Sequence, residues 1–376
     1  MTVYDCIIIG AGPAGASAAY HLAKRGRSVL LLEKATLPRY KPCGGGVSPQ
    51  IGTWFDFDFG PVISARVREL CFTWQQTEAV TASLPDSASI WMVRRDHFDH
   101  FLVQQAQTQG ASLQEGTKAL GIHLQQGVWT VNTSQGPQQG KYLIAADGAK
   151  GVTARWLSFP TRSHYTAGAI EIEPRLAVPQ PQRAYFEFGL LKNGYVWNFP
   201  KADGYSLGSG VFNSSQRQGR DLIPSLQKYA HRFGVDLNQV KTHGHPILLW
   251  NGPQKLHTEQ ALLAGEAAGV VDPFTAEGIR PSIFSGIKAA EAIDQALGGQ
   301  QQALMGYSQI MAEEWGAEMR WAKRLAIFFY QFPRLSYRWG VSSARGVAQM
   351  AEVFTGERSY GDVVKRVQKK FSSYLP

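Results

Sequence analysis

A glycine-rich turn follows the first predicted strand, close to the N-terminus of the chain. The apolar residues between 3 and 9 predict a buried parallel strand, and Gly10-Ala11-Gly12-Pro13-Ala14-Gly15 comes directly after it. Residues 16–25 have the composition of a helix, and a second apolar run, 28–32, ends at Glu33. This order of strand, glycine turn, helix, strand and acid is the context that a dinucleotide-binding G-x-G-x-x-G turn requires.

Each glycine of the turn has an expected role. Gly10 allows a tight turn, Gly12 lets the backbone approach a pyrophosphate, and Gly15 lets the helix lie close to the strand. The helix N-terminus offers N–H groups and a positive dipole end to phosphates, and Glu33 is placed to accept a hydrogen bond from a ribose hydroxyl. The predicted cofactor-binding residues of this segment are Gly10, Ala11, Gly12, Pro13, Ala14, Gly15, Glu33 and Lys34.

Length and composition indicate a globular protein. The chain has 376 residues, 44% of them hydrophobic and 18% charged, which allows two domains around a substantial core. The first strand begins at Val3 and no apolar run is long enough to span a bilayer, so we expect a cytoplasmic protein. Its three cysteines lack the spacing of metal ligands, and we predict no metal site.

The net charge of +9 favours an acidic partner, either nucleic acid, anionic lipid, a phosphorylated substrate or an acidic protein. Composition does not choose among these. Because a nucleic-acid role would depend on charge alone, we predict no nucleic-acid partner.

Two later segments return to the pattern of the N-terminus. Residues 142–146 predict a buried strand that ends at Asp147-Gly148, where ligands bind in parallel sheets; an ordinary Asp-Gly turn is the alternative. Residues 261–269 contain a further strand and Gly265-Glu266, followed by a loop and a helix that begins near Gly278-Ile279. These segments predict a second place to hold a polar cofactor.

The intervening segments alternate as strands do. Residues 66–75, 81–92 and 166–211 predict a second, antiparallel sheet that forms one wall of a cleft. The predicted fold class is α/β, a discontinuous Rossmann-type nucleotide domain with an inserted antiparallel sheet and a C-terminal helical region. We assign 1–60, 95–165 and 257–300 to the nucleotide domain, 61–94 and 166–256 to the substrate-binding sheet domain, and 301–376 to the helical region.

The C-terminal region has an aromatic and basic character. Helical spacing predicts one shared face for Trp321, Leu325, Phe328, Phe329 and Phe332. Residues 320–345 contain six basic residues and no acidic ones. Two interpretations are equally open, a helix packed on the body of the protein and a helix that lies on a membrane surface.

The combination of motifs resembles the FAD-binding set of flavoproteins built like p-hydroxybenzoate hydroxylase. The resemblance depends on Gly10–Gly15, Glu33, Arg95, Asp147-Gly148 and Gly265-Glu266. The chain departs from that set at Glu266, where aspartate is usual, and at Val152, where a small hydroxyl residue is common. The resemblance implies FAD as cofactor and adds these predicted contacts: Arg95, Ala119, Asp147, Gly148, Glu266, Gly278 and Ile279.

Three further stretches, 41–46, 195–201 and 354–360, resemble segments of the geranylgeranyl reductase family. This resemblance implies a reductase that saturates isolated C=C bonds of a prenyl chain by flavin hydride transfer, with NADPH or reduced ferredoxin as electron donor. It places Gly44 and Gly45 in a loop over the flavin, and Tyr195 and Trp197 along a substrate tunnel. A prenyl substrate also favours a peripheral membrane location.

The chemistry of an isolated alkene requires a proton donor, because no carbonyl stabilises the carbanion that hydride addition would leave. Cys43 is a candidate catalytic acid or positioning group, and a buried inert thiol is equally open. Tyr195 and Trp197 alternate on one strand face, so they either line the tunnel or belong to the core. The alternative functions are a flavin monooxygenase or halogenase acting on a hydrophobic molecule, and a flavoprotein electron carrier to quinone.

Overall fold

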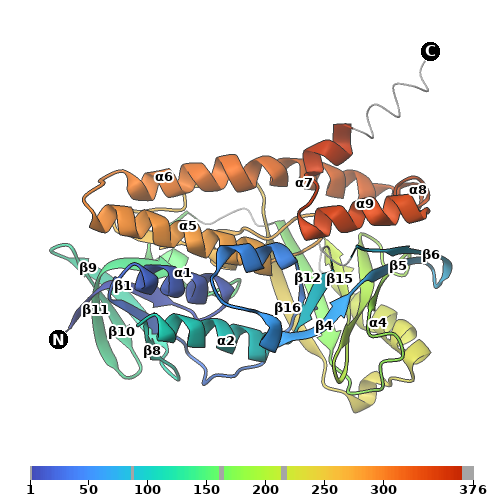
Figure 1. The fold of residues 1–376 in the computed structure, drawn as a ribbon, viewed down its shortest axis with the longest axis horizontal. Helices are drawn as coiled ribbons and strands as arrows, with labels where there is room; N and C mark the ends of the chain where they lie inside the picture. The colour runs from blue at the N-terminus through green and yellow to red at the C-terminus, as the bar shows by residue number, and fades with distance from the viewer. Residues whose placement is uncertain (1, 86–88, 161–164, 213–217, 366–376) are drawn as a thin grey trace.

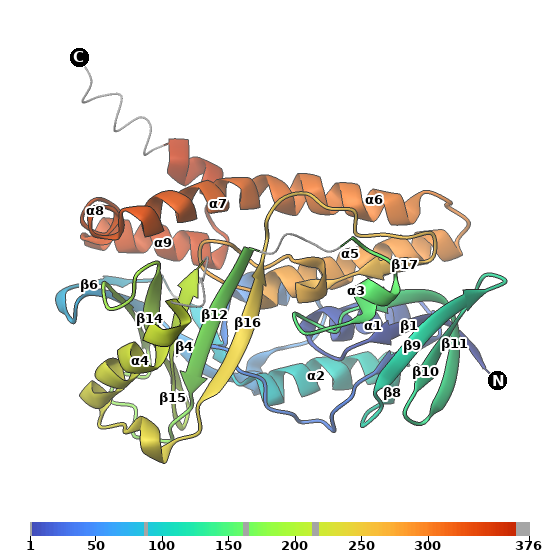
Figure 2. The same cartoon turned by 180° about the vertical axis from the view of Figure 1, so that it is seen from behind.

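The computed structural model describes residues 2–85, 89–160, 165–212 and 218–365 (Figures 1 and 2). The predicted α/β class is confirmed: a nucleotide-binding sheet, a second sheet and C-terminal helices are all present. In Figure 1 the two large sheets lie at opposite ends of the molecule, and the helices α5 (Ile279–Leu297), α6 (Ala303–Ile310) and α7 (Gly316–Gln331) run above them. The end of the predicted helical region, 366–376, lies outside the described residues, and the domain boundaries remain a prediction.

The nucleotide sheet has the strand order β8-β2-β1-β11-β10-β9, and a further strand, β17, pairs with β11. β1 pairs with β2 and β11 in parallel, and its Ile7 and Ile8 are fully buried, as the continuous apolar run predicts. The strands are β1 (Val3–Ile9), β2 (Val29–Leu32), β8 (Ser112–Gln114), β9 (Ala119–Gln125), β10 (Val128–Thr133), β11 (Gly136–Ala145) and β17 (Ala261–Leu263).

Three helices pack together beside this sheet. α1 (Pro13–Lys24) lies against α2 (Arg95–Thr108) and against α5 (Ile279–Leu297). The approach of α5 to α1 is so close that a Cβ at Gly286 would lie 2.2 Å from the carbonyl oxygen of Ala14. The chain therefore leaves the nucleotide unit after β11 and returns at β17 and α5 to complete it.

The second sheet has the order β16-β12-β15-β14-β13-β5-β6. All of its pairs are antiparallel except β5 with β13. Its strands are β5 (Glu69–Trp74), β6 (Thr77–Ser83), β12 (Tyr165–Ile172), β13 (Arg183–Phe188), β14 (Gly194–Lys201), β15 (Gly204–Phe212) and β16 (His243–Leu249), and α4 (Leu222–Ala230) packs against β15.

The prediction of one strand-like stretch over 81–92 is wrong. β6 ends at Ser83, and the next strand is β7 (Ile90–Val93), which pairs with β3 (Gly46–Val47) and β4 (Ile63–Val67) in a separate small sheet. Pro85 follows β6 and has no N–H group for a ladder hydrogen bond, which favours a break there. The small sheet joins the 41–46 loop to the body of the protein.

The C-terminal helices are α6 (Ala303–Ile310), α7 (Gly316–Gln331), α8 (Pro333–Ser336) and α9 (Ala344–Thr355). The predicted shared face of α7 is wrong in part, because Phe329 is buried while Phe328 and Phe332 are 44% and 47% exposed. The buried face instead runs through Met319, Ala322, Ala326 and Phe329. Alanines allow a closer approach than the aromatic residues would, which rotates the helix away from the face that aromatic spacing predicts.

Candidate functional site

A cavity of about 690 Å³ is lined by residues of the nucleotide sheet, the second sheet and α9. Of the predicted cofactor and catalytic residues, all except Ala11 and Gly15 line it. The structure therefore brings together segments that lie more than three hundred residues apart, from Ile9 to Phe354.

The glycine turn has the geometry that its sequence predicts. Gly10 has a φ of +106°, which L-residues rarely adopt, and a Cβ at Gly15 would lie 1.9 Å from the carbonyl oxygen of Gly10. At Gly12 the nearest atom to such a Cβ is a guanidinium nitrogen of Arg39 at 4.0 Å. Space beside Gly12 is thus open for a ligand.

The carboxylate of Glu33 holds this turn. Its Oε2 accepts a hydrogen bond from the N–H of Ala11 and its Oε1 from the N–H of Ala35, both at 3.1 Å. Arg39 Nε lies 3.4 Å from Glu33 Oε2. Replacing Glu33 is therefore expected to weaken the fold of the turn as well as cofactor binding.

Arg95 is fixed by an acid that sequence analysis missed. Asp99 accepts hydrogen bonds from Arg95 Nε at 2.7 Å and Nη2 at 2.8 Å, and from Arg39 Nη1 at 3.0 Å. Burial alone would raise the pKa of Asp99, but the two guanidinium groups outweigh it and hold that pKa below its ordinary value. The i, i+4 spacing of Arg95 and Asp99 on α2 is a signal that could have found this pair.

Asp147 has one oxygen in use and one without a donor. Its Oδ2 accepts hydrogen bonds from the N–H groups of Val152 and Thr153 and from the Thr153 hydroxyl, at 2.8, 3.0 and 2.7 Å. The hydroxyl expected at position 152 is thus supplied by the next residue. Asp147 Oδ1 is buried and has no hydrogen-bond partner among the described residues. A ligand hydroxyl would satisfy it.

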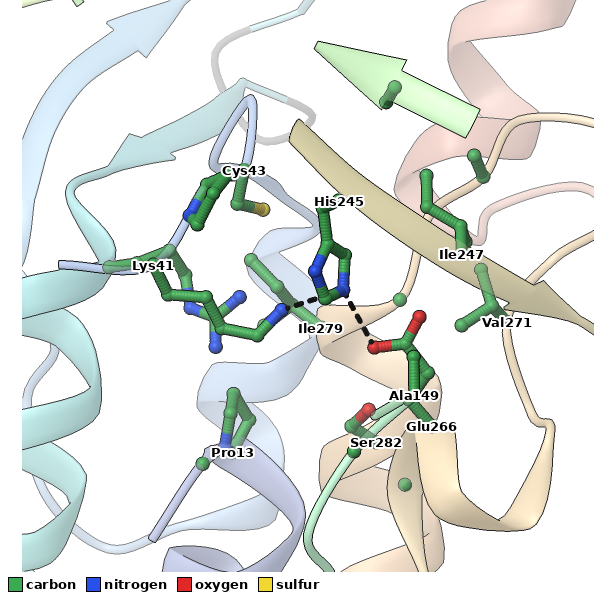
Figure 3. Close-up of a pocket in the computed structure, with 18 of the residues that line it drawn as sticks. Pro13, Lys41, Cys43, Ala149, His245, Ile247, Glu266, Val271, Ile279 and Ser282 are labelled. Atoms are coloured by element: carbon green, nitrogen blue, oxygen red, sulfur yellow. Dashed lines mark hydrogen bonds and ion pairs between the residues drawn. The ribbon is translucent and has the colours of Figure 1, made fainter. Parts of the chain in front are cut away.

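Glu266 reaches across to the second sheet (Figure 3). Its Oε1 accepts a hydrogen bond from the Leu248 N–H at 3.2 Å, and its Oε2 lies 3.2 Å from His245 Nε2. Lys41 Nζ lies 3.2 Å from the same nitrogen of His245. Burial favours the neutral carboxyl, but His245 and Lys41 hold the pKa of Glu266 below its ordinary value. The sequence indicated neither His245 nor Lys41 as a site residue, because their partners lie far away in the chain.

The loop that contains Cys43 packs closely against β14. A Cβ at Gly44 would lie 2.9 Å from the Phe199 ring, and one at Gly45, where φ is +73°, would lie 2.1 Å from the carbonyl oxygen of Val93. Lys201 is buried, and its Nζ donates hydrogen bonds to the carbonyl oxygens of Gly44 and Val93, both at 2.7 Å. The sulfur of Cys43 points toward the space that His245 and Glu266 also face (Figure 3).

Tyr195 and Trp197 both line the cavity, where Trp197 is buried and Tyr195 is partly buried against the core. The Tyr195 hydroxyl donates to the carbonyl oxygen of Thr275 at 2.8 Å, and Trp197 Nε1 donates to Ser206 Oγ at 3.0 Å. Burial raises the pKa of Tyr195. Beside them is a part of the cavity that we call the apolar lobe, lined by Leu70, Ile90, Met92, Phe186, Phe199 and Phe354.

These features fit FAD. The open space at Gly12 suits a pyrophosphate, and the donor-free oxygen of Asp147 suits a hydroxyl of the ribityl or ribose part. The N-terminus of α5, at Gly278 and Ile279, lies at the cavity wall, where the positive end of the helix dipole favours a phosphate.

A family model described as an FAD binding domain matches residues 3–190. An uncharacterized protein of Methanosarcina barkeri is 31% identical over 299 residues, covering 79% of this chain and 76% of the relative. Menaquinone reductase of Mycobacterium tuberculosis is 27% identical and covers 92% of this chain and 88% of its own. Geranylgeranyl diphosphate reductase of a Synechocystis species is 29% identical, with coverages of 76% and 74%.

Solved structures share the fold. A geranylgeranyl bacteriochlorophyll reductase-like protein of Thermoplasma acidophilum aligns with a TM-score of 0.79 at 21% identity, covering 94% of this chain and 92% of that one. The flavin-dependent brominase Bmp2 aligns with a TM-score of 0.73 at 18% identity, with coverages of 98% and 100%. At these identities the likeness supports the fold and does not choose between reduction and halogenation.

Proposed function

Because this chain belongs to the FAD-binding family of geranylgeranyl reductase-like oxidoreductases, we propose that it saturates isolated C=C bonds of a prenyl chain. The observation that carries the proposal is the continuity of one cavity, which extends from the glycine turn past Cys43 to the apolar lobe. An electron carrier to quinone would not need such a lobe. The curated relatives that act on prenyl compounds support the same substrate class.

The part of the chain in the reaction is to hold the alkene, exclude water and deliver one proton. When bound, reduced FAD supplies a hydride equivalent. The alkene carbon opposite the one that receives hydride must gain a proton, because no neighbouring group stabilises the negative charge. The aromatic and aliphatic side chains of the apolar lobe suit a chain of isoprene units and keep water away from the reacting bond.

We propose that the Cys43 thiol donates this proton to the alkene. Its sulfur points into the cavity, and the other cysteines, Cys6 and Cys71, are buried away from the cavity lining. Tyr195 is less suited, because its hydroxyl already donates to the Thr275 carbonyl and burial raises its pKa. The thiolate left after each turnover regains its proton from solvent. NADPH or reduced ferredoxin is the proposed electron donor to FAD.

A test of the function begins with dithionite-reduced protein under anaerobic conditions. Prenyl diphosphates, prenyl quinones and prenylated pigments are supplied in turn, and the products are weighed by mass spectrometry. We expect one class to gain two hydrogens per reduced bond, and Cys43→Ser to bind FAD while its rate falls by roughly a hundredfold to ten-thousandfold. A parent enzyme that transforms substrate only when oxygen is present would instead be a monooxygenase or halogenase.

We also propose that the protein works at a membrane surface, where prenyl lipids reside. The end of α7, α8 and the residues after it expose a set of large apolar side chains that we call the apolar patch, namely Ile327, Phe328, Phe332, Leu335 and Trp339. Arg320, Arg324, Arg334 and Arg338 lie in the same segment. Among the described residues, no helix is long and apolar enough to cross a bilayer, so the proposed contact is peripheral.

A further inference from the structure

A buried carboxyl group lies directly behind the Cys43 loop. Glu171, on β12, lines the cavity and is only 2% exposed. Its Oε1 accepts a hydrogen bond from the Cys43 N–H at 2.7 Å and another from the Tyr40 hydroxyl at 2.8 Å. The loop is thus bound to the second sheet at the residue whose thiol faces the cavity.

The second oxygen of the same carboxyl connects, through Ser206, to a side chain of β14, the strand against which the loop packs. The Ser206 hydroxyl lies 3.3 Å from Glu171 Oε2, and the Ser206 oxygen accepts the hydrogen bond from Trp197 Nε1. Glu171 therefore joins two groups of the proposed active site, the backbone at Cys43 and, through Ser206, the indole of Trp197.

A carboxyl at this place is costly for the fold. Burial raises the pKa of Glu171, and the nearby Glu173 adds to that effect. Lys201 binds the loop from its other side, at the carbonyl of Gly44. Glu171 accepts the Cys43 N–H and Lys201 donates to the Gly44 carbonyl, so the backbone is held on both sides of the peptide bond that joins these two residues.

We propose that Glu171 is a positioning residue that fixes the Cys43 thiol relative to the neighbouring Trp197 indole. This inference rests on the proposed function, in which the Cys43 thiol protonates the bound alkene. A displacement of about 1 Å between a catalytic group and a bound substrate costs on the order of a hundredfold in rate. Three successive glycines have many accessible backbone conformations, so the loop depends on contacts such as those of Glu171 and Lys201 for a fixed position.

The test uses the full-length protein loaded with FAD and compares Glu171→Ala and Glu171→Gln with the parent. The first readout is the rate at which iodoacetamide alkylates Cys43, followed on the Cys43 peptide by mass spectrometry. We expect about a tenfold faster alkylation in Glu171→Ala, because the loop is released, and a rate near that of the parent in Glu171→Gln, whose amide oxygen still accepts the Cys43 N–H. The second readout is turnover, where kcat of Glu171→Ala should fall about a hundredfold with KM changed less than threefold.

Glu187→Ala is the matched control. Glu187 is a fully buried carboxyl on β13 of the same sheet, its pKa is also raised by burial, and it does not line the cavity. Its loss should leave Cys43 alkylation and kcat unchanged. Equal alkylation and equal kcat in Glu171→Ala and the parent would overturn the inference.

Ser206→Ala keeps the test decisive if Glu171→Ala does not fold. It removes only the link to Trp197, so we expect a lower kcat with an unchanged Cys43 alkylation rate; an unchanged kcat would contradict the inference. Absence of prenyl reduction by the parent enzyme would refute the proposed function, whereas the alkylation rates would still report whether Glu171 holds the loop.

Discussion

At the scale of single residues, Ala276 stands in a conformation that alanine rarely adopts. It lines the cavity with a φ of +60°. A left-handed backbone conformation destabilises an L-residue by roughly 1–2 kcal/mol, and glycine removes most of this strain. The greater freedom of glycine in the unfolded chain offsets about 0.5–1 kcal/mol of that gain. We predict that Ala276→Gly raises the free energy of unfolding by about 0.5 kcal/mol in urea titrations. Ala348→Gly, inside α9, should instead lower it by about 1 kcal/mol. An equal decrease in the free energy of unfolding of both variants would show that Ala276 is not strained.

Glu277 gives a prediction about pH. Burial raises the pKa of Glu277 from 4.5 to about 7, against the opposing charge of Arg280. Because the folded state favours the neutral carboxyl, the protein is more stable when Glu277 is protonated. This stabilisation is complete below pH 4.5 and is lost as pH rises through 7. Glu277→Gln cannot ionise. Its free energy of unfolding, relative to the parent, should rise by up to roughly 3 kcal/mol between pH 4.5 and pH 8. A constant difference across that range would contradict the shifted pKa.

The site residues divide into those the sequence could indicate and those it could not. Gly10, Glu33 and Asp147 belong to local motifs, in which the functional residue and the element that positions it are neighbours in the chain. Glu171 and His245 act through partners 128 and 21 residues away, respectively, on other elements. Only the folded arrangement of sheets and loops shows those contacts, so periodicity and spacing carry no signal for them.

At the scale of elements, two glycines of β15 offer a matched pair. A Cβ at Gly208 would lie 2.0 Å from the Trp197 ring, whereas the nearest atom to one at Gly210 lies at 3.6 Å. We predict that Gly208→Ala displaces the indole, lowers the free energy of unfolding by about 1–3 kcal/mol and abolishes prenyl turnover. Gly210→Ala should retain turnover. Urea unfolding and the product assay check both variants, and normal turnover in Gly208→Ala would show that the position of Trp197 is not critical.

Most strands and helices could be predicted from the sequence, because a continuous apolar run indicates a strand buried on both faces and a periodic pattern indicates an element with one buried face. The exceptions share a cause. The stretch 81–92 continues to alternate across a change of sheet, and the buried face of α7 is chosen by its neighbours rather than by its most hydrophobic residues. In both segments the local pattern correctly indicates a strand or a helix, but it does not specify which element of the fold packs against it.

At the scale of the whole molecule, the C-terminal helices have two kinds of apolar surface. One packs on the second sheet, where Phe329 contacts Phe188, and the other is the exposed apolar patch. The two interpretations that the sequence left open therefore apply to different faces of the same segment. Because Phe329 belongs to the core, it is unsuitable for a test of membrane binding.

We predict that the protein floats with liposomes that contain anionic lipid and that Phe328→Ser combined with Phe332→Ser reduces the floating fraction severalfold. The apolar side chains insert at the interface, and the arginines of the segment add roughly 1 kcal/mol each near an anionic surface. Raising salt should weaken binding, since it screens those charges. Leu120→Ser combined with Leu124→Ser, at exposed positions of β9, is the control and should float as the parent does. Equal flotation of all three proteins, or of none, would show that the patch does not bind membranes.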